Sequence, residues 1–345
     1  MNVADIINGK WTAITEPILG PGGPKAWDGL SAITPGIFQK GVSKKYGIFY
    51  SGLSSVSGTW GIGYAESDDL MHWEKHPANP VLIYEDDENY IGFDSPCLVK
   101  RNGIFHLFCE EKKFKKTVRG KVKQMLPMNL RLSLGRLRRS FRNEEGAVSV
   151  QHADGRYFVS FTSNNLLKWS LSSRRLILEK GKAGNFDSSG LFSSQVHELD
   201  GRYYMFYGGS NGSVTSTGLA VSDDLSKWTR SDASPILKPG GSGEWDENNA
   251  LMVSVLRMED GYCGFYEGED AQNTYRIGLA YSYDLSRWEK CEGNPIVETG
   301  TKGSFNERMS CSPHIFSDNG QVVLFHSGHD RNMRGSCGVA VFERN

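Results

Sequence analysis

The stretch ESDDLMHWEKHPANPVL (66–82) returns along the chain as VSDDLSKWTRSDASPIL (221–237) and as YSYDLSRWEKCEGNPIV (281–297). A less regular copy is TSNNLLKWSLSSRRLIL (162–178), and the tail of the motif, GKWTAITEPIL, lies at 9–19. A unit that repeats at a nearly fixed period is typical of solenoids, propellers and arrays. The sequence therefore predicts five related units, each anchored by one tryptophan: Trp11, Trp73, Trp169, Trp228 and Trp288.

Each unit has a second shared half, which precedes the tryptophan motif. Examples are FDSSGLFSSQVHELDGRYYMFYGG (186–209) and WDENNALMVSVLRMEDGYCGFYEG (245–268). Alternating apolar residues, aromatic enrichment and Asp-Gly turns predict two strands in this half. A third strand, such as IGLAYS (277–282), and then the tryptophan strand follow. Each unit therefore reads as a four-stranded blade.

The two ends of the chain complement each other. The last unit stops at CGVAVFERN (337–345) without a tryptophan strand, and the missing strand corresponds to residues 11–19. Radially repeated four-stranded sheets form propellers, which leave only short strand edges exposed. We expect an all-β, five-bladed β-propeller whose N-terminal strand completes the last blade and closes the ring. Residues 1–345 would form this single domain.

One interval between tryptophans is about 35 residues longer than the others, and the surplus coincides with residues 112–142. This segment holds 12 of the 39 basic residues and no acidic one, which leaves 27 basic against 40 acidic residues elsewhere. The overall net charge of −1 therefore hides a basic insertion, within the second blade, on an acidic body. Leucines and methionines intersperse the basic residues.

The composition of this insertion suits an anionic membrane surface or a lipid-linked or polyanionic glycan. The alternative is a solvated loop that packs a few leucines on the blade below. Nucleic acid is not an expected partner, because the chain as a whole carries no basic excess.

The remaining bulk features favour a cytoplasmic protein without cofactors. The N-terminus lacks the basic and apolar regions of a secretory signal, and no apolar run approaches the length of a membrane span. Six scattered cysteines show no CxxC pair and no metal-ligand spacing, so we expect reduced thiols and no metal.

Acidic residues gather where first strands begin and second strands end, and in an antiparallel blade these two points are adjacent. We therefore expect a pocket in the central funnel. Glycosyl transfer needs one protonated and one ionised carboxyl, so a carboxylate-rich funnel suits that chemistry. The acids are Asp28, Asp94, Asp187, Asp246, Glu247 and Glu307 at strand starts, and Glu110, Glu111, Glu267 and Glu269 at strand ends.

Residues that break the repeat are the stronger functional candidates. Asp94 stands where other units have an apolar residue, and Glu267 stands where they have serine or glycine. Asp28 and Asp187 recur at equivalent places, so each has an alternative role as a hydrogen-bonding residue at a turn or strand entry. As catalytic residues we predict Asp28, Asp94, Asp187 and Glu267, and as substrate-binding residues Trp27, Glu247, Glu307, Arg308, His314 and His326.

Motifs such as DGRYYMFYGG (200–209), IGLAYSYDLSRWEK (277–290) and NPIV (294–297) make the chain resemble the five-bladed propeller glycosidases. These are glycoside hydrolase family 43 and its relatives in families 32, 62, 68 and 130. The likeness covers nearly the whole chain, and its motifs are specific for the fold but weak for the substrate. It implies three carboxylates on the first strands of the first three blades: a base or nucleophile, an orienting Asp and a general-acid Glu.

Carried over by position, Asp94 in FDSP (93–96) matches the orienting Asp, and Asp28 is a looser match for the base or nucleophile. The third blade has GLFSS (190–194) where the general-acid Glu is expected. The acid would then be Asp187 or Glu267, or would be missing.

The main hypothesis is a glycosidase that cleaves or transfers a glycosyl unit of a cytoplasmic or lipid-linked glycan. A second is a glycoside phosphorylase like those of family 130, in which cations of the fifth unit would bind phosphate: Arg308, His314, His326, His329 and Arg331. A third is a catalytically inactive propeller that binds a glycan or a protein. Fold alone does not decide among them.

Overall fold

The computed structural model describes residues 1–42, 44–84, 90–113 and 155–344. Within these segments the chain forms 21 strands, one α-helix, α1 (Val3–Asn8), and one 3-10 helix (Leu171–Ser173). The predicted all-β class is confirmed. None of the described helices has the length and apolar character needed to span a membrane.

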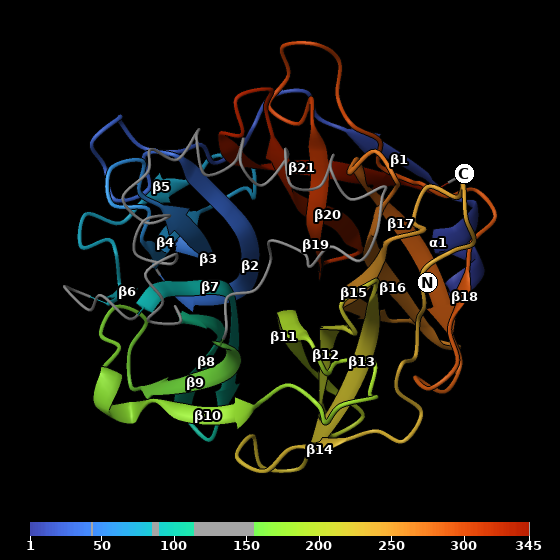
Figure 1. Ribbon diagram of the computed structural model, residues 1–345. Helices are drawn as coiled ribbons and strands as arrows, with labels where there is room; N and C mark the ends of the chain where they lie inside the picture. The colour runs from blue at the N-terminus through green and yellow to red at the C-terminus, as the bar shows by residue number, and fades with distance from the viewer. Residues whose placement is uncertain (43, 85–89, 114–154, 345) are drawn as a thin grey trace, which may run out of the picture.

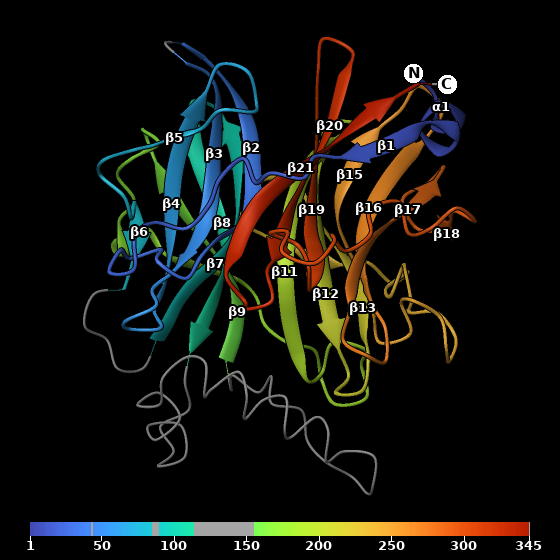
Figure 2. The same cartoon turned by 90° about the horizontal axis from the view of Figure 1, so that it is seen from above.

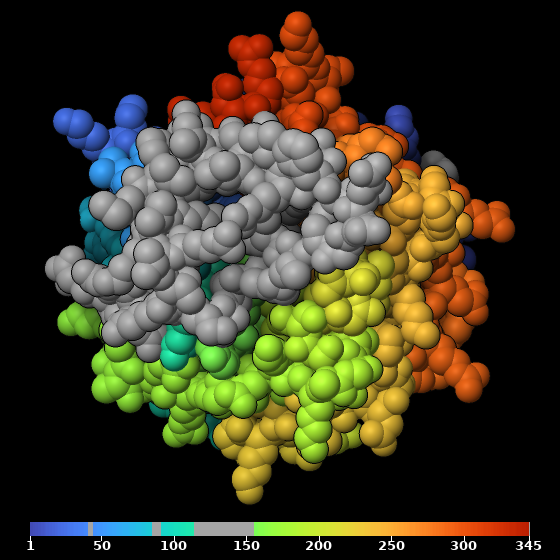
Figure 3. Space-filling model, in the orientation of Figure 1, coloured from blue at the N-terminus to red at the C-terminus, as the bar shows by residue number. Residues whose placement is uncertain are grey.

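The strands pair into groups. The innermost strand of a group is called its first strand, and the group is named after it. First strands lie innermost in Figure 1, and each contacts the first strand of the next group, from β2 through to β19 and back to β2. In Figure 3 the described segments follow one another around the outline in sequence order. The first strands are β2 (Ser31–Val42), β7 (Tyr90–Arg101), β11 (Gly190–Leu199), β15 (Asn249–Arg257) and β19 (Met309–Asp318).

Within each group, neighbouring strands are antiparallel, and the second and third strands follow the first directly outward. The second strands are β3 (Lys44–Leu53), β8 (Ile104–Lys113), β12 (Arg202–Ser210), β16 (Tyr262–Glu269) and β20 (Gln321–His329). The third strands are β4 (Trp60–Ser67), β9 (Gly155–Ser163), β13 (Thr215–Ser222), β17 (Tyr275–Ser282) and β21 (Gly335–Glu343).

The outermost strands are short. They are β5 (Glu74–Lys75), β10 (Arg175–Leu178), β14 (Thr229–Arg230), β18 (Glu289–Lys290) and, in the β19 group, β1 (Lys10–Ala13); β6 (Leu82–Ile83) also pairs with β4. Strand β1 pairs antiparallel with β21, so the N-terminal segment supplies the fourth strand of the last group. The two termini consequently lie close together beside α1 (Figures 1 and 2).

The repeated tryptophans join neighbouring groups. Each ring meets, edge to face, a phenylalanine on the second strand of the preceding group, at interplanar angles of 78° to 88°. Such aromatic pairs combine large apolar burial with a favourable edge-to-face geometry. The pairs are Trp73 with Phe325, Trp169 with Phe49, Trp228 with Phe108, Trp288 with Phe206, and Trp11 with Phe265.

In the regular copies of the tryptophan motif, an aspartate four residues before the tryptophan shapes the turn. In the β15 group, the Asp284 carboxylate accepts the backbone N–H groups of Ser286 and Arg287, both at 2.9 Å. The indole N–H of Trp288 donates to the carbonyl of Leu285, which has a φ of 65°. Aspartate favours such local turns, so the recurring Asp-Leu-x-x-Trp text encodes a turn that presents the tryptophan.

Most of the predicted basic insertion 112–142 lies outside the described residues. Its first two residues, Lys112 and Lys113, are the last residues of β8, and Lys112 is buried. These two lysines therefore belong to the strand rather than to the insertion. All six cysteines fall in the described segments, where they are free thiols.

Candidate active site

A recurring hydrogen bond links each of four strand groups to the next along the inner strands. The donor is the N–H of a residue in a β-bulge of a first strand, and the acceptor is a side chain on the second strand of the preceding group. The donors all have positive φ, between 32° and 54°, so their N–H groups turn out of the regular ladder. The pairs are Ser95 with Ser51 (3.0 Å), Ser193 with Glu110 (3.0 Å), Ser312 with Glu267 (2.8 Å) and Thr34 with Ser327 (2.8 Å).

Asp94 lies at the bulge of β7 and is buried. One carboxylate oxygen accepts the N–H of Ser95 at 2.7 Å, and the other forms an ion pair with the Lys112 ammonium. Burial opposes ionisation, but the Lys112 charge and hydrogen bonds from Ser51 and Ser95 outweigh it and hold the pKa of Asp94 below its usual value. Asp94 is therefore an anion.

Glu267 lies near the end of β16 and has the opposite tendency. Its carboxyl accepts the N–H of Ser312 at 2.8 Å and the side-chain amide of Asn249 at 3.1 Å. Burial raises the pKa of Glu267 to about 7, the two hydrogen bonds reduce the effect, and the charges of Glu269 and Asp94 add to it. Within the described residues, no Lys, Arg or His side chain forms an ion pair with Glu267. Near neutral pH it is thus partly protonated.

Glu110 is the cross-strand partner of Asp94. Its carboxylate forms an ion pair with Arg156 at 2.5 Å and lies 4.0 Å from the Lys112 ammonium. Lys112 and Arg156 therefore balance the charges of Asp94 and Glu110. No group of three or more His, Cys, Asp or Glu side chains within the described segments is arranged to hold a metal ion.

Two histidines of β20 are uncharged near neutral pH. Burial lowers the pKa of both His326 and His329 to about 4, although the charges of Asp330 and Asp94 partly oppose the shift at His329. Each ring has one buried nitrogen without a hydrogen-bond partner, Nε2 in His326 and Nδ1 in His329. His326 packs beside Phe305, with ring centroids 5.8 Å apart.

The other three candidate cations of the last unit are His314, Arg308 and Arg331, and both arginines are exposed. His314 is held between the Gln195 side chain, at 2.7 Å, and the backbone of Ile37, at 3.2 Å, and burial lowers its pKa to about 3. The predicted cluster of cations in the last unit is therefore reduced to exposed arginines, because burial keeps the histidines neutral.

The recurring aspartates make ion pairs inside their own groups. In each case the carboxylate also accepts a hydrogen bond from a buried tyrosine of the second strand, at 3.2 to 3.3 Å. These contacts favour the structural role that repetition suggested for Asp28 and Asp187. The ion pairs are Asp28 with Lys75 (2.5 Å), Asp187 with Arg230 (2.9 Å) and Asp246 with Lys290 (2.5 Å).

Three further predicted residues shape loops. The Trp27 ring packs beside Tyr50, with centroids 5.8 Å apart, and against Gly52. Glu247 and Glu307 occupy equivalent loops, and each accepts a backbone N–H four residues earlier at 2.7 Å. The structure places the Asp94 charge near enough to Glu267 to add to the rise of its pKa, and it places Trp27, Glu247 and Glu307 in local packing or turn contacts.

Glu110, Lys112 and Arg156 are site residues that were not predicted to be catalytic or substrate-binding, although Glu110 was among the acids expected at strand ends. Glu110 stands two residues before Lys112 on β8, so the strand period of two puts them on the same face. Pairing the two predicted strands in antiparallel register would have placed Glu110 opposite Asp94. The basic run that follows Lys112 made it look like part of the insertion, and Arg156 lies within the same long interval, after that run.

The chain has distant relatives among carbohydrate-active enzymes. No family model matches it. It is 22% identical to a 1,2-beta-oligomannan phosphorylase of Thermoanaerobacter sp. (strain X514), over 95% of each chain.

Solved structures resemble this fold across nearly its full length. One, a complex of BT0996 with RGII, has a TM-score of 0.68 and 15% identity, and the likeness covers 98% of this chain and 93% of that one. Another comes from work on glycoside hydrolases, within the GH130 family of mannoside phosphorylases, that target β-1,2 mannosidic linkages in Candida mannan. Its TM-score is 0.64 at 16% identity, covering 96% of this chain and 93% of that one. The chain therefore shares the fold of these propeller enzymes.

Proposed function

We propose that this protein is a glycosidase that cleaves mannosidic linkages with Glu267 and Asp94 as its paired carboxyls. The observation that carries the proposal is their opposite protonation behaviour, with a raised pKa at Glu267 and a lowered one at Asp94. Pairs of titratable groups whose surroundings push their pKa values apart are the signature of an acid and its ionised partner. The names of the relatives supply the mannosidic linkage.

We further propose that the strand groups are the blades of one five-bladed propeller spanning residues 1–345. The pairing of β1 with β21 supports closure of the ring by the N-terminal strand. The contact of Trp73 with Phe325, which joins the first group to the last, supports it as well. A likeness to family 43 in particular stays a prediction, as does a cytoplasmic location.

In the proposed reaction Glu267 donates its proton to the oxygen of the leaving sugar. Asp94 stabilises the positive charge that develops on the other sugar ring and accepts the proton of the attacking water. The two carboxyls thereby exchange protonation states, and the bond between the sugar carbon and the leaving oxygen is replaced by one to water. This division of labour is that of paired carboxyls in glycoside hydrolysis.

Phosphate is the alternative nucleophile, because the relative at 22% identity is named a phosphorylase. The charges at the site favour water. Lys112 and Arg156 are engaged with Asp94 and Glu110, and His326 and His329 are neutral. Lys112 and Arg156 only just balance the negative charge of these carboxylates. A phosphate dianion would therefore find little positive charge to bind it.

The test uses β-1,2-linked manno-oligosaccharides with and without inorganic phosphate. We expect free mannose as product, at a rate independent of phosphate; mannose 1-phosphate would indicate the phosphorylase instead. Glu267→Gln cannot donate a proton, so its kcat should fall about 10²- to 10⁴-fold. Asp187→Asn changes the other candidate acid and should retain most activity, because Asp187 is bound to Arg230.

Unchanged thermal unfolding of both variants would show that the comparison reports chemistry. Full activity of Glu267→Gln, with activity lost in a folded Asp187→Asn, would transfer the role of acid to Asp187. An absence of turnover on any β-mannoside by the parent protein would favour the non-catalytic, glycan-binding alternative.

The predicted contact of segment 112–142 with an anionic membrane or a lipid-linked glycan remains a proposal. A basic segment with interspersed leucines has the chemistry for it. Binding to vesicles with and without anionic lipid, by the parent and by a form lacking residues 114–142, tests the idea. Equal binding by both forms would reject it.

A further inference from the structure

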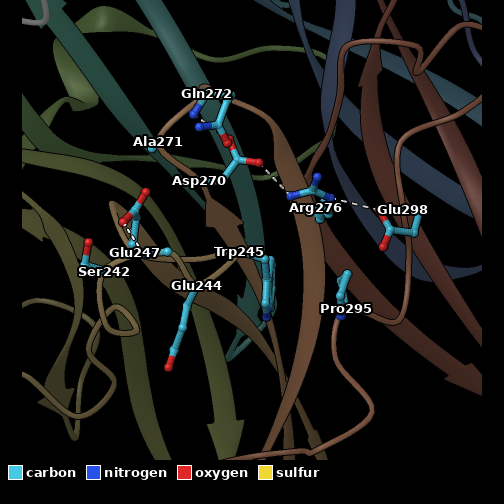
Figure 4. A pocket seen from close by; sticks show the side chains of 11 residues that line it. Ser242, Glu244, Trp245, Glu247, Asp270, Ala271, Gln272, Arg276, Pro295 and Glu298 are labelled. Atoms are coloured by element: carbon cyan, nitrogen blue, oxygen red, sulfur yellow. Dashed lines mark hydrogen bonds and ion pairs between the residues drawn. The ribbon is translucent and has the colours of Figure 1, made fainter.

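A pocket with a volume of 590 Å³ lies beside the β15 group, and neither of the paired carboxyls is among its lining residues (Figure 4). Its size is within the range of small-molecule sites. It is formed by the loop before β15, the turn between β16 and β17, and the loop after β18. The lining residues that carry polar or aromatic groups are Ser242, Glu244, Trp245, Glu247, Asp270, Gln272, Arg276 and Glu298.

Arg276 lies between two carboxylates in this pocket. Its guanidinium forms ion pairs with Asp270 at 2.9 Å and Glu298 at 2.8 Å, and Figure 4 shows it between these two carboxylates. Asp270 is itself buried and accepts the backbone N–H groups of Gln272 and Thr274, each at 2.9 Å. The buried Asp270 carboxylate and the guanidinium paired with it form a preorganised pair of hydrogen-bonding groups, whereas the Glu298 carboxylate is exposed.

Trp245 supplies an aromatic surface to the same pocket. One side of its ring packs against Gly268 and Gly278, and the ring centroid lies 5.4 Å from that of Tyr266. Phenylalanine performs this packing at the equivalent position in the β11 group, Phe186 against Gly209. Packing therefore requires an aromatic ring but not an indole. The larger, half-buried Trp245 ring remains available to a ligand.

The charged side chains that line the pocket indicate which class of ligand it can bind. Four carboxylates line the pocket against one guanidinium, which itself is paired. This excess of negative charge disfavours phosphate and acidic sugars. Carboxylates accept hydrogen bonds from hydroxyl groups, and an aromatic ring packs against the C–H face of a sugar. An uncharged sugar unit satisfies both requirements.

We propose that this pocket is a distal subsite that binds an uncharged sugar unit of an oligosaccharide substrate. The inference rests on the proposed function only in taking Glu267 to mark the point of cleavage. Asp270 follows Glu267 by three residues, just past the end of β16, so their Cα atoms are about 10 Å apart at the rise of a strand. A chain of a few sugars is long enough to occupy both places.

The test measures binding by calorimetry in the Glu267→Gln background, which prevents turnover. The probes are a β-1,2-linked mannobiose, a longer β-1,2-manno-oligosaccharide and an oligogalacturonide. Arg276→Gln should weaken binding of the longer neutral chain about tenfold and leave mannobiose binding unchanged. Trp245→Phe keeps the packing over Gly268 and should weaken the longer chain less. The oligogalacturonide should not bind.

Arg202→Gln is the matched control, because Arg202 forms an ion pair with Asp223 through its Nε atom at 2.8 Å, in a different group. It should bind every probe as the parent does. Equal affinity of Arg276→Gln and the parent for the longer chain, or tighter binding of the oligogalacturonide, would overturn the proposal. If the parent binds but never cleaves, the proposed function fails while this comparison still decides the role of the pocket.

Discussion

Asp94 on first strand β7 and Glu267 on second strand β16 each accept a backbone N–H, yet their pKa values shift in opposite directions. The difference is the Lys112 ammonium, which pairs with Asp94. Burial disfavours the charged form of a carboxyl, and a nearby opposite charge restores it. One lysine at the end of β8 therefore decides which of the two carboxyls is the anion.

Lys112→Met is expected to raise the pKa of Asp94 and to destabilise the protein by about 3 to 5 kcal/mol, because it leaves a buried charge unpaired. Catalysis requires ionised Asp94, so the acidic limb of the kcat/KM profile should move to higher pH. The alkaline limb near pH 7, set by Glu267, should remain. The profile and urea unfolding provide the measurements.

The sign of the effect on stability follows from the lowered pKa. Asp94 stabilises the fold above its unfolded pKa of about 3.9 and loses that contribution as the pH falls through its lower folded value. The difference in the free energy of unfolding between the parent and Lys112→Met should therefore become smaller as the pH falls. Lys290→Met, which breaks the pair with Asp246, is the matched control and should destabilise without moving the acidic limb. An acidic limb unmoved in Lys112→Met would contradict the role of the lysine.

At the level of the strands, close packing of an aromatic ring on a glycine recurs from group to group. The ring belongs to the residue before the recurring Asp or Asn, and the glycine lies near the end of the second strand. A Cβ atom on the glycine would fall 2.2 to 2.4 Å from the ring. The pairs are Trp27 with Gly52, Phe186 with Gly209, Trp245 with Gly268 and Phe305 with Gly328.

Gly209→Ala is expected to destabilise the protein by about 1 to 3 kcal/mol, because the added methyl group would overlap Phe186 and Asp187 in a packed interior. Urea unfolding measures the change. Gly293→Ala is the control, since nothing lies within 4 Å of its added carbon. It should be neutral or slightly stabilising. Equal effects of the two substitutions would mean that the aromatic contact does not constrain the strand.

On the scale of the whole molecule, the N-terminal segment bridges the last two strand groups. Val3 and Ile6 of α1 pack with core residues of both the β15 and β19 groups. The N–H of Val3 donates to Asp260 at 2.8 Å, and β1 pairs with β21. Trp11 contacts Phe265 of one group and Phe342 of the other. Contacts between the ends of a chain of this length oppose local opening of the last group.

Trp11→Ala should therefore lower the free energy of unfolding by about 2 to 4 kcal/mol. Trp11→Phe should cost much less, because the indole Nε1 is buried without a hydrogen-bond partner and a phenyl ring retains most of the packing. Chemical denaturation with two probes measures the difference and tests for a single transition. Equal stability of the two variants would show that the ring contributes little to holding the ends together.

The repeats alone predicted the all-β class, the strand order within each unit and the role of the tryptophans as anchors. These properties depend on local patterns, namely a period of two in the strands and Asp-containing turns between them. Departures from the repeat also indicated Asp94 and Glu267. A carboxyl at a position that other units fill with an apolar or small residue is not required by the repeat, so it indicates a function.

Tertiary structure alone decided which carboxyl is ionised and which side chains are neutral. The Lys112–Asp94 pair, the contact of Arg156 with Glu110 and the neutral state of His329 depend on distances between segments and on burial. The pocket around Arg276 likewise assembles from three separate loops. Sequence patterns record the local period of each strand, whereas pKa values depend on charges brought close through space.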